Sequence, residues 1–139
     1  MIYLVKLIMG LKGSGKTKTL VDLVRRAVDE EHGCVVCIEK NRNLTYDIPY
    51  TARLIHAGEY GIVSNELLRG FISGLHAGNY DISHVFIDNF YKMLDDTSEQ
   101  AVLEMLQWLE KFSASEKVSF TISATADPDT VGDDIKKYF

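Results

Sequence analysis

The segment from Met9 to Leu20 contains the pattern G-x-x-x-x-G-K-[ST], with Gly10, Gly15, Lys16 and Thr17 at its fixed positions. Glycines let successive backbone N–H groups turn toward a phosphate group. The lysine ammonium can reach terminal phosphates as a point charge, and the threonine hydroxyl is a hard oxygen ligand that suits Mg²⁺. We therefore predict that this segment binds the phosphates of a nucleotide together with Mg²⁺.

The stretches on either side of this segment have the order that a phosphate-binding loop requires. The stretch "IYLVKLIM" before it is a short apolar, β-branched run, which is typical of a buried strand. After it, apolar residues from Leu20 to Val28 follow helical spacing, and Gly33 is expected to end that helix as a C′ glycine. The amino end of the helix would then point at the anion. The residues expected to contact the nucleotide here are Gly10, Gly13, Ser14, Gly15, Lys16, Thr17 and Lys18.

A second acidic position completes the expected metal site. The apolar stretch "HVFID" ends in Asp88, and ligands of parallel α/β sheets lie at the carboxyl ends of the strands. A phosphate loop needs such an acid to hold Mg²⁺, directly or through water. We predict Thr17 and Asp88 as the metal ligands. Asp95 and Asp96 precede a helix start and are interpreted as solvated.

At this point the chain resembles the P-loop NTPases, with Gly10–Thr17 as the Walker A motif and Val85–Asp88 as the Walker B motif. One strand, "CVVCIE", lies between the two motif strands in the sequence, and "VSFTISA" follows them. That order is similar to the RecA-like, additional-strand division of the family. The resemblance implies an α/β three-layer sandwich with a mostly parallel sheet and a minimal core ordered 1-4-3-2. It also implies a polar γ-phosphate sensor at the tip of the inserted strand, for which Ser123 is the first choice and Thr125 the second.

The remaining elements alternate in a way that favours one α/β domain over residues 1–139. The stretch 51–63 is expected to form two short edge segments around Gly58. The stretch 64–78 is expected to be a helix capped by Ser64 or Asn65. A further helix over 97–112 has Thr97 and Gln100 in capping-box spacing. Asp127 and Pro128 are expected to open a last short helix.

Composition narrows the functional classes. The chain has 139 residues and a formal net charge of −5, which argues against general nucleic-acid affinity. No apolar run is long enough to span a membrane, and a cytoplasmic location is expected. Cys34 and Cys37 lie three apart on an expected strand and are interpreted as structural thiols. ATP is the expected nucleotide, because the guanine-reading pattern N-K-x-D is absent.

Turnover depends on which group activates water. Members of the RecA-like group often carry a catalytic glutamate at the end of the second strand, and Glu39 ends "CVVCIE"; the alternative is a glutamate that merely caps the strand. Asn89 follows Asp88 where relatives commonly have glutamate. An asparagine can orient a water but cannot take its proton near neutral pH. The expected catalytic set is therefore Lys16, Glu39 and Asn89, with slow hydrolysis by the isolated chain.

Other P-loop groups stay open at this stage. Thymidine kinases and the phage assembly ATPases that resemble zonula occludens toxin both have an aspartate–glutamate pair, which this chain lacks. The twitching-motility PilT group shares G-x-x-G-S-G-K-[ST], and short bacterial chains can bear its label on that similarity alone. The leading hypothesis is a weak or partner-activated ATPase that acts as a nucleotide switch with a protein partner or a second copy. A small-molecule phosphotransferase and a non-catalytic nucleotide-binding module are the alternatives. Arg42 is a candidate phosphate or partner contact.

Overall fold

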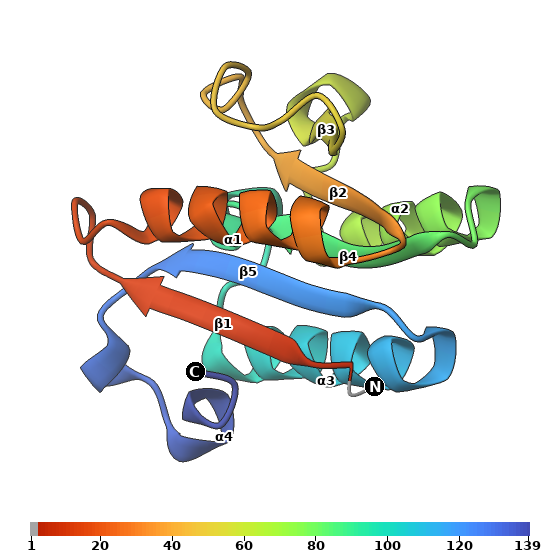
Figure 1. Ribbon diagram of the computed structural model, residues 1–139. Helices are drawn as coiled ribbons and strands as arrows, with labels where there is room; N and C mark the ends of the chain where they lie inside the picture. The colour runs from red at the N-terminus through yellow and green to blue at the C-terminus, as the bar shows by residue number, and fades with distance from the viewer. Residues whose placement is uncertain (1–2) are drawn as a thin grey trace.

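A computed structural model describes residues 3–139 of the chain (Figure 1). The strands are β1 (Val5–Gly10), β2 (Cys34–Glu39), β3 (Arg53–His56), β4 (Ile82–Ile87) and β5 (Ser119–Thr125). The α-helices are α1 (Lys16–Glu30), α2 (Asn65–Gly78), α3 (Glu99–Glu116) and α4 (Asp133–Lys136). Short 3-10 helices, η1 (Ala57–Tyr60), η2 (Phe90–Met93) and η3 (Pro128–Thr130), connect some of them.

All five strands belong to one parallel sheet with the order β1-β5-β4-β2-β3. The last strand, β5, lies between β1, which leads into the Walker A motif, and β4, which carries the Walker B motif. The predicted order 1-4-3-2 of the four expected strands is therefore confirmed. The parallel arrangement also brings the carboxyl ends of these strands, and the polar residues there, to one edge of the sheet.

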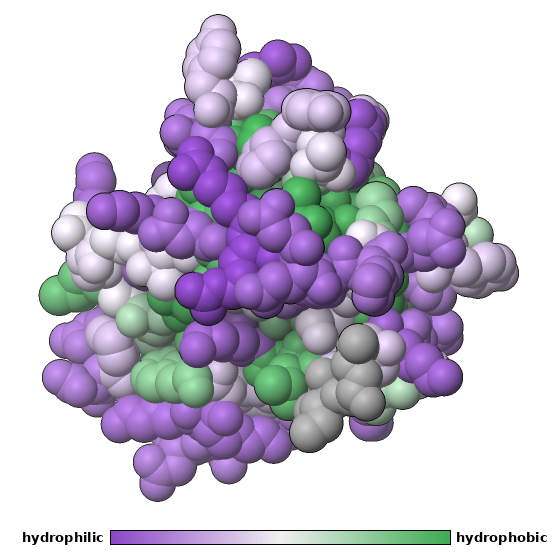
Figure 2. Space-filling model, viewed as in Figure 1, coloured by the Kyte–Doolittle hydropathy of each residue, from purple (hydrophilic) through white to green (hydrophobic). Residues whose placement is uncertain are grey.

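Helices cover both faces of the sheet, as predicted: α1 lies on one face, and α2 and α3 lie on the other (Figure 1). Successive strand residues point to opposite faces. In β2, Cys37 packs in the core under α1, whereas its neighbour Ile38 packs in the larger core under α2 and α3. The outer face of α1 is mostly hydrophilic, as Figure 2 shows, which fits a helix that buries one side.

The region around Gly58 differs from the prediction. The first segment, β3, is a strand parallel to β2 at the edge of the sheet, and the second is the 3-10 helix η1 rather than a strand. Gly58 does not turn a hairpin. Its N–H donates to the carbonyl of Lys40 at 3.1 Å, and a Cβ there would lie 2.7 Å from that same oxygen. The glycine therefore serves a close approach between two chain segments.

Two predicted helix boundaries were wrong. Helix α1 ends at Glu30, and Gly33 lies beyond it; a Cβ at Gly33 would come within 2.5 Å of the Ser83 Cβ, so packing against β4 explains this glycine. Helix α3 is capped by Ser98, whose hydroxyl accepts from the Ala101 N–H, and not by Thr97. The capping of α2 by Ser64 is confirmed.

Candidate nucleotide-binding site

The loop between β1 and α1 has the backbone conformation expected of a phosphate cradle. Gly13 and Gly15 have positive φ values of 83° and 87°, which side chains rarely allow. Gly10 lacks room for a side chain, because a Cβ would lie 2.4 Å from the Ser14 Oγ. The backbone conformation of the loop therefore requires glycine at positions 13 and 15, whereas Gly10 makes room for the Ser14 side chain.

The amino end of α1 is left open for an anion. Gly15 caps the helix without a side-chain hydrogen bond, and the first turn contains no acidic residue. The first N–H groups of a helix have no partner inside the helix and bear a partial positive charge. Lys16 is 8% exposed and folds back so that its Nζ donates to the Leu11 carbonyl at 3.0 Å. Its ammonium group therefore stays over the loop, next to these N–H groups.

Polar side chains lie in one row near the carboxyl ends of three strands. The register pairs Ile38 with Ile87 and Ile87 with Ile122. The next residue on each strand is Glu39, Asp88 and Ser123, respectively. These three side chains point to the α1 face of the sheet, since their positions share the parity of Cys37 and Phe86 in the core beneath α1. The sheet thus brings the predicted residues of three separate strands together.

Asp88 is the centre of this row. It is 4% exposed, and its Oδ1 accepts the Thr17 hydroxyl at 3.3 Å and the Ser123 hydroxyl at 2.8 Å. These partners are neutral, and none of the ion pairs among residues 3–139 involves Asp88. A buried carboxylate beside a second hard oxygen, without a cation of its own, fits Mg²⁺ well. Among residues 3–139, no group of three or more His, Cys, Asp or Glu residues that could hold a metal ion is found.

Asn89 has a left-handed backbone, with φ 51° and ψ 53°, which asparagine tolerates better than most residues. Its side chain bridges two strands: Nδ2 donates to Asp88 Oδ2 at 3.4 Å, and Oδ1 accepts the Thr125 hydroxyl at 3.3 Å. A cavity of about 210 Å³ opens beside it, lined by Asn89, Tyr91, Lys92 and Thr125. Sequence reasoning missed Tyr91 and Lys92, because a polar turn after a strand does not reveal which side chains turn back to the site.

Ser123 and Thr125 occupy different environments. Ser123 is 0% exposed, and besides its bond to Asp88 its Oγ accepts the Asn89 N–H at 3.0 Å. Its hydroxyl therefore orients the two residues of the Walker B end. Thr125 is exposed at the tip of β5, opposite Gly10 in the register. Of the two hydroxyls, the one on Thr125 is open to a ligand.

Glu39 is turned toward its own loop. It is 2% exposed, and its two carboxylate oxygens accept the backbone N–H groups of Asn43 at 2.9 Å and Leu44 at 3.1 Å. His56 Nδ1 lies 3.4 Å from Oε2. These contacts anchor the β2–β3 loop, whose Leu44 packs in the core under α1. The assignment of Glu39 as a base stays a prediction beside this anchoring role.

The anchoring role predicts a loss of stability. Glu39→Gln should lower the free energy of unfolding by about 1–3 kcal/mol, because one of the two backbone N–H groups would then face an amide NH₂. Glu59→Gln is the matched control, since Glu59 is half-exposed and pairs with Arg42 on the surface. Urea denaturation followed by circular dichroism measures both. An unchanged midpoint for Glu39→Gln would show that the carboxylate does not hold the loop.

Other candidate residues lie outside this centre. Arg42 pairs with Glu59 and is mostly exposed, and Lys18 is exposed on the first turn of α1. Cys37 is fully buried, and burial, with help from the Asp88 and Glu39 carboxylates, raises the pKa of its thiol. Cys37 therefore stays a neutral structural thiol, whereas Cys34 is free and partly exposed.

A strand, a glycine loop with Lys16, a helix, and an aspartate at the end of β4, which β5 separates from β1, define a P-loop nucleotide-binding domain. Residues 6–138 match the family described as "ATPase family associated with various cellular activities (AAA)". This match covers nearly the whole chain, so the chain belongs to the AAA family, which lies within the predicted additional-strand division. Nothing in the match points to the PilT group. No curated protein matches the chain at a significant level. Among residues 3–139, no helix is long and apolar enough to cross a membrane.

Proposed function

We propose that this AAA domain binds Mg-ATP through Gly10–Thr17 and Asp88 and works as a nucleotide switch whose own hydrolysis is slow. Family membership implies ATP binding and hydrolysis. The slow rate and the need for a partner are our inference. The observation that supports it is the amide of Asn89 beside Asp88, in contact with both Asp88 and Thr125.

The roles of the individual residues follow from their contacts. The Thr17 hydroxyl and the Asp88 carboxylate would hold Mg²⁺, which neutralises phosphate charge when it is bound. Lys16 would leave the Leu11 carbonyl for the terminal phosphates. Ser123 keeps Asp88 and Asn89 in place, and Thr125 is the hydroxyl that we assign to sensing the γ-phosphate. The assignment of a cytoplasmic location, where ATP is available, is part of this proposal.

Slow turnover follows from the chemistry of the asparagine. Asn89 can hold a water in the cavity that it lines with Lys92 and Thr125, but it cannot accept the proton that the attacking water must lose. Glu39 would be the nearest predicted base, and both of its oxygens already accept backbone N–H groups. Either a loop movement that frees Glu39 or a group from a partner would then be needed for fast hydrolysis.

Steady-state phosphate release tests this proposal. We expect wild-type turnover well below the ~1 s⁻¹ at the low end of typical enzymes. Asn89→Glu should raise the rate, because it supplies a carboxylate next to Asp88, whereas the neutral control Asn89→Gln should not. Lys16→Ala provides the blank for contaminating ATPase. Wild-type turnover above ~1 s⁻¹ without any partner would contradict the slow-switch proposal.

A phosphotransferase is the second candidate, and the cavity beside Asn89 favours it. The cavity has a volume of about 210 Å³, enough for a small acceptor, and Lys92 and Tyr91 are among the residues that line it. Burial, and to a smaller extent the Glu99 carboxylate, raises the pKa of Tyr91, so this hydroxyl stays protonated at neutral pH. If ADP release depended on an added acceptor, the result would favour the phosphotransferase over the nucleotide switch. Tight ATP binding without any turnover would choose a non-catalytic module.

A further inference from the structure

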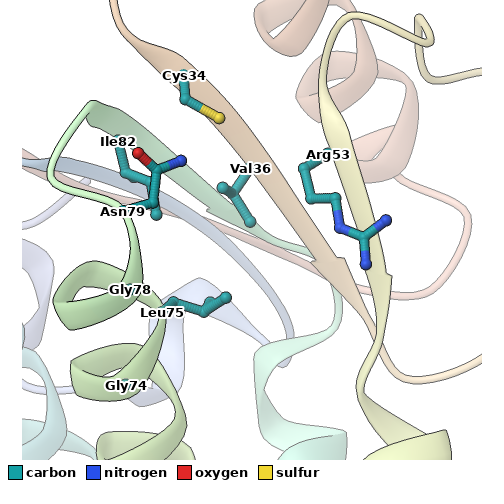
Figure 3. A pocket seen from close by; sticks show the side chains of 8 residues that line it. All are labelled: Cys34, Val36, Arg53, Gly74, Leu75, Gly78, Asn79 and Ile82. Carbon is teal, nitrogen blue, oxygen red and sulfur yellow. The ribbon is translucent and has the colours of Figure 1, made fainter.

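A second cavity lies at the opposite end of the sheet from the nucleotide site. It has a volume of about 390 Å³ and lies between α2 and the amino-terminal ends of β2, β3 and β4 (Figure 3). Its floor is apolar, formed by Val36, Leu75 and Ile82. The nucleotide motifs lie at the carboxyl ends of the strands, so this cavity has no part in the site described above.

Two glycines of α2 keep this cavity open. Gly74 and Gly78 line it, and a Cβ built at either position would meet no atom within 4 Å. Their backbone is not left-handed, since the positive-φ glycines of the described residues are Gly13, Gly15 and Gly61. A helical glycine that neither conformation nor packing requires is less favourable than alanine. Gly74 and Gly78 therefore leave this cavity open to a ligand.

The polar side chains at the cavity indicate an anionic group on the ligand. Arg53 on β3 extends along one side, and Asn79 at the end of α2 lies on the other (Figure 3). None of the ion pairs found among residues 3–139 involves Arg53, and no carboxylate is among the described residues that line the cavity. Arg53 is exposed, and a guanidinium at the rim of an apolar floor suits a carboxylate on an apolar body. The carboxyl end of α2 adds partial negative charge here, which opposes any anion and opposes a doubly charged phosphate more than a singly charged carboxylate.

We infer that this cavity binds a small monocarboxylate with an apolar body, with Arg53 as the anion contact and Val36, Leu75 and Ile82 under the apolar part. Asn79 can donate from Nδ2, because the hydrogen bond to the Asp81 N–H uses its Oδ1. This carboxylate site is separate from the nucleotide site, so tests of the two sites have independent outcomes.

An NMR titration of the full chain with 3-phenylpropanoate tests the inference, with 3-phenylpropanamide as the neutral match. We expect saturable shifts of the Gly74 and Gly78 amide signals by the acid, with a Kd on the order of 1 mM or lower. The amide should bind roughly tenfold more weakly, and Arg53→Gln should reduce acid binding to the level of the amide. Equal binding of acid and amide would overturn the assignment to carboxylates.

A pair of variants on one helix locates the site. Gly74→Leu should fill the cavity and lower the affinity for 3-phenylpropanoate at least about tenfold, whereas Gly70→Leu should leave that affinity unchanged. Gly70 lies one turn away on α2, also has open space at its Cβ, and does not line the cavity. Thermal unfolding checks that both variants fold. Unchanged binding by folded Gly74→Leu, or no shifts in wild type up to about 10 mM acid, would overturn the inference.

Cys34 offers an independent readout at the same cavity. Its thiol lines the cavity and is partly exposed, whereas Cys37 is fully buried. N-ethylmaleimide should therefore modify Cys34 first, and saturating 3-phenylpropanoate should slow that reaction at least about threefold by occupying the adjacent space. The amide at the same concentration should protect less. Labelling at an unchanged rate in the presence of saturating acid would contradict binding at this place.

Discussion

Replacing Lys16 with alanine should weaken Mg-ATP binding by a factor between about 30 and several thousand, the equivalent of ~2–5 kcal/mol for a buried charge contact. The loop would keep its glycine geometry but would lose the ammonium group that it holds over the open end of α1. Because the Lys16 side chain bonds only to the Leu11 carbonyl in this structure, the fold should be unaffected. Calorimetric titration with Mg-ATP measures the affinity, and circular dichroism measures the fold.

Lys18→Ala is the matched control for this prediction. Lys18 is exposed two residues further along α1, and it was among the residues predicted to contact the nucleotide. As a solvated charge it should change the affinity by less than about threefold. If both variants lost affinity equally, general positive charge rather than the loop-held ammonium would be responsible. If wild type bound Mg-ATP more weakly than about 1 mM, the assignment of the phosphate loop itself would be wrong.

The phosphate loop could be predicted because its constraints are local. Positive φ at Gly13 and Gly15 and the lack of space at Gly10 are properties of a few consecutive residues, and the pattern records them directly. The row of polar strand ends was also predictable, since Asp88 ends an apolar run and parallel strands end at one edge. The strand order followed from the resemblance to the additional-strand division, which the sheet confirms.

The misses have a common physical cause, which is dependence on contacts that are distant in the chain. The first expected edge segment is β3, but the second is the 3-10 helix η1 rather than a strand. Gly33 was assigned to a helix end and Gly58 to the break between two edge segments, although each makes room for another segment of the chain. For Glu39, the pattern indicated the position at the end of β2 but not the direction of the carboxylate. That direction depends on the backbone of Asn43 and Leu44, which no spacing rule describes.

The cavity under α2 could not be predicted for a related reason. Gly74 and Gly78 occur in the stretch 64–78, which was expected to be a helix, and helical spacing does not show which strands lie opposite them. The two glycines line a cavity because β2 and β3 lie opposite them in the folded chain. A long-range arrangement thus turned two weak helix residues into the wall of a cavity.

Asp88→Asn should affect ATP binding only where Mg²⁺ takes part. The substitution keeps the size of the side chain but replaces a carboxylate ligand with a neutral amide, which binds a hard cation less well. Partners that merely orient a metal ligand contribute about 10–100-fold in metal affinity or activity, so losing the ligand itself should cost at least tenfold in affinity for Mg-ATP. Affinity for ATP in EDTA should change little, or even improve, since a negative charge near the phosphates is removed.

The ratio of the two affinities separates a metal role from a structural one. Asp88 Oδ1 also accepts the Thr17 and Ser123 hydroxyls, so a local loss of order would lower binding with and without Mg²⁺ alike. Asp96→Asn, the same change at an exposed position, should leave both affinities unaltered. Titration calorimetry of wild type and both variants, each with Mg²⁺ and with EDTA, gives the four comparisons needed. A selective loss in Mg²⁺ would establish Asp88 as the metal ligand, whereas an equal loss in both conditions would reduce it to a residue that supports the phosphate loop.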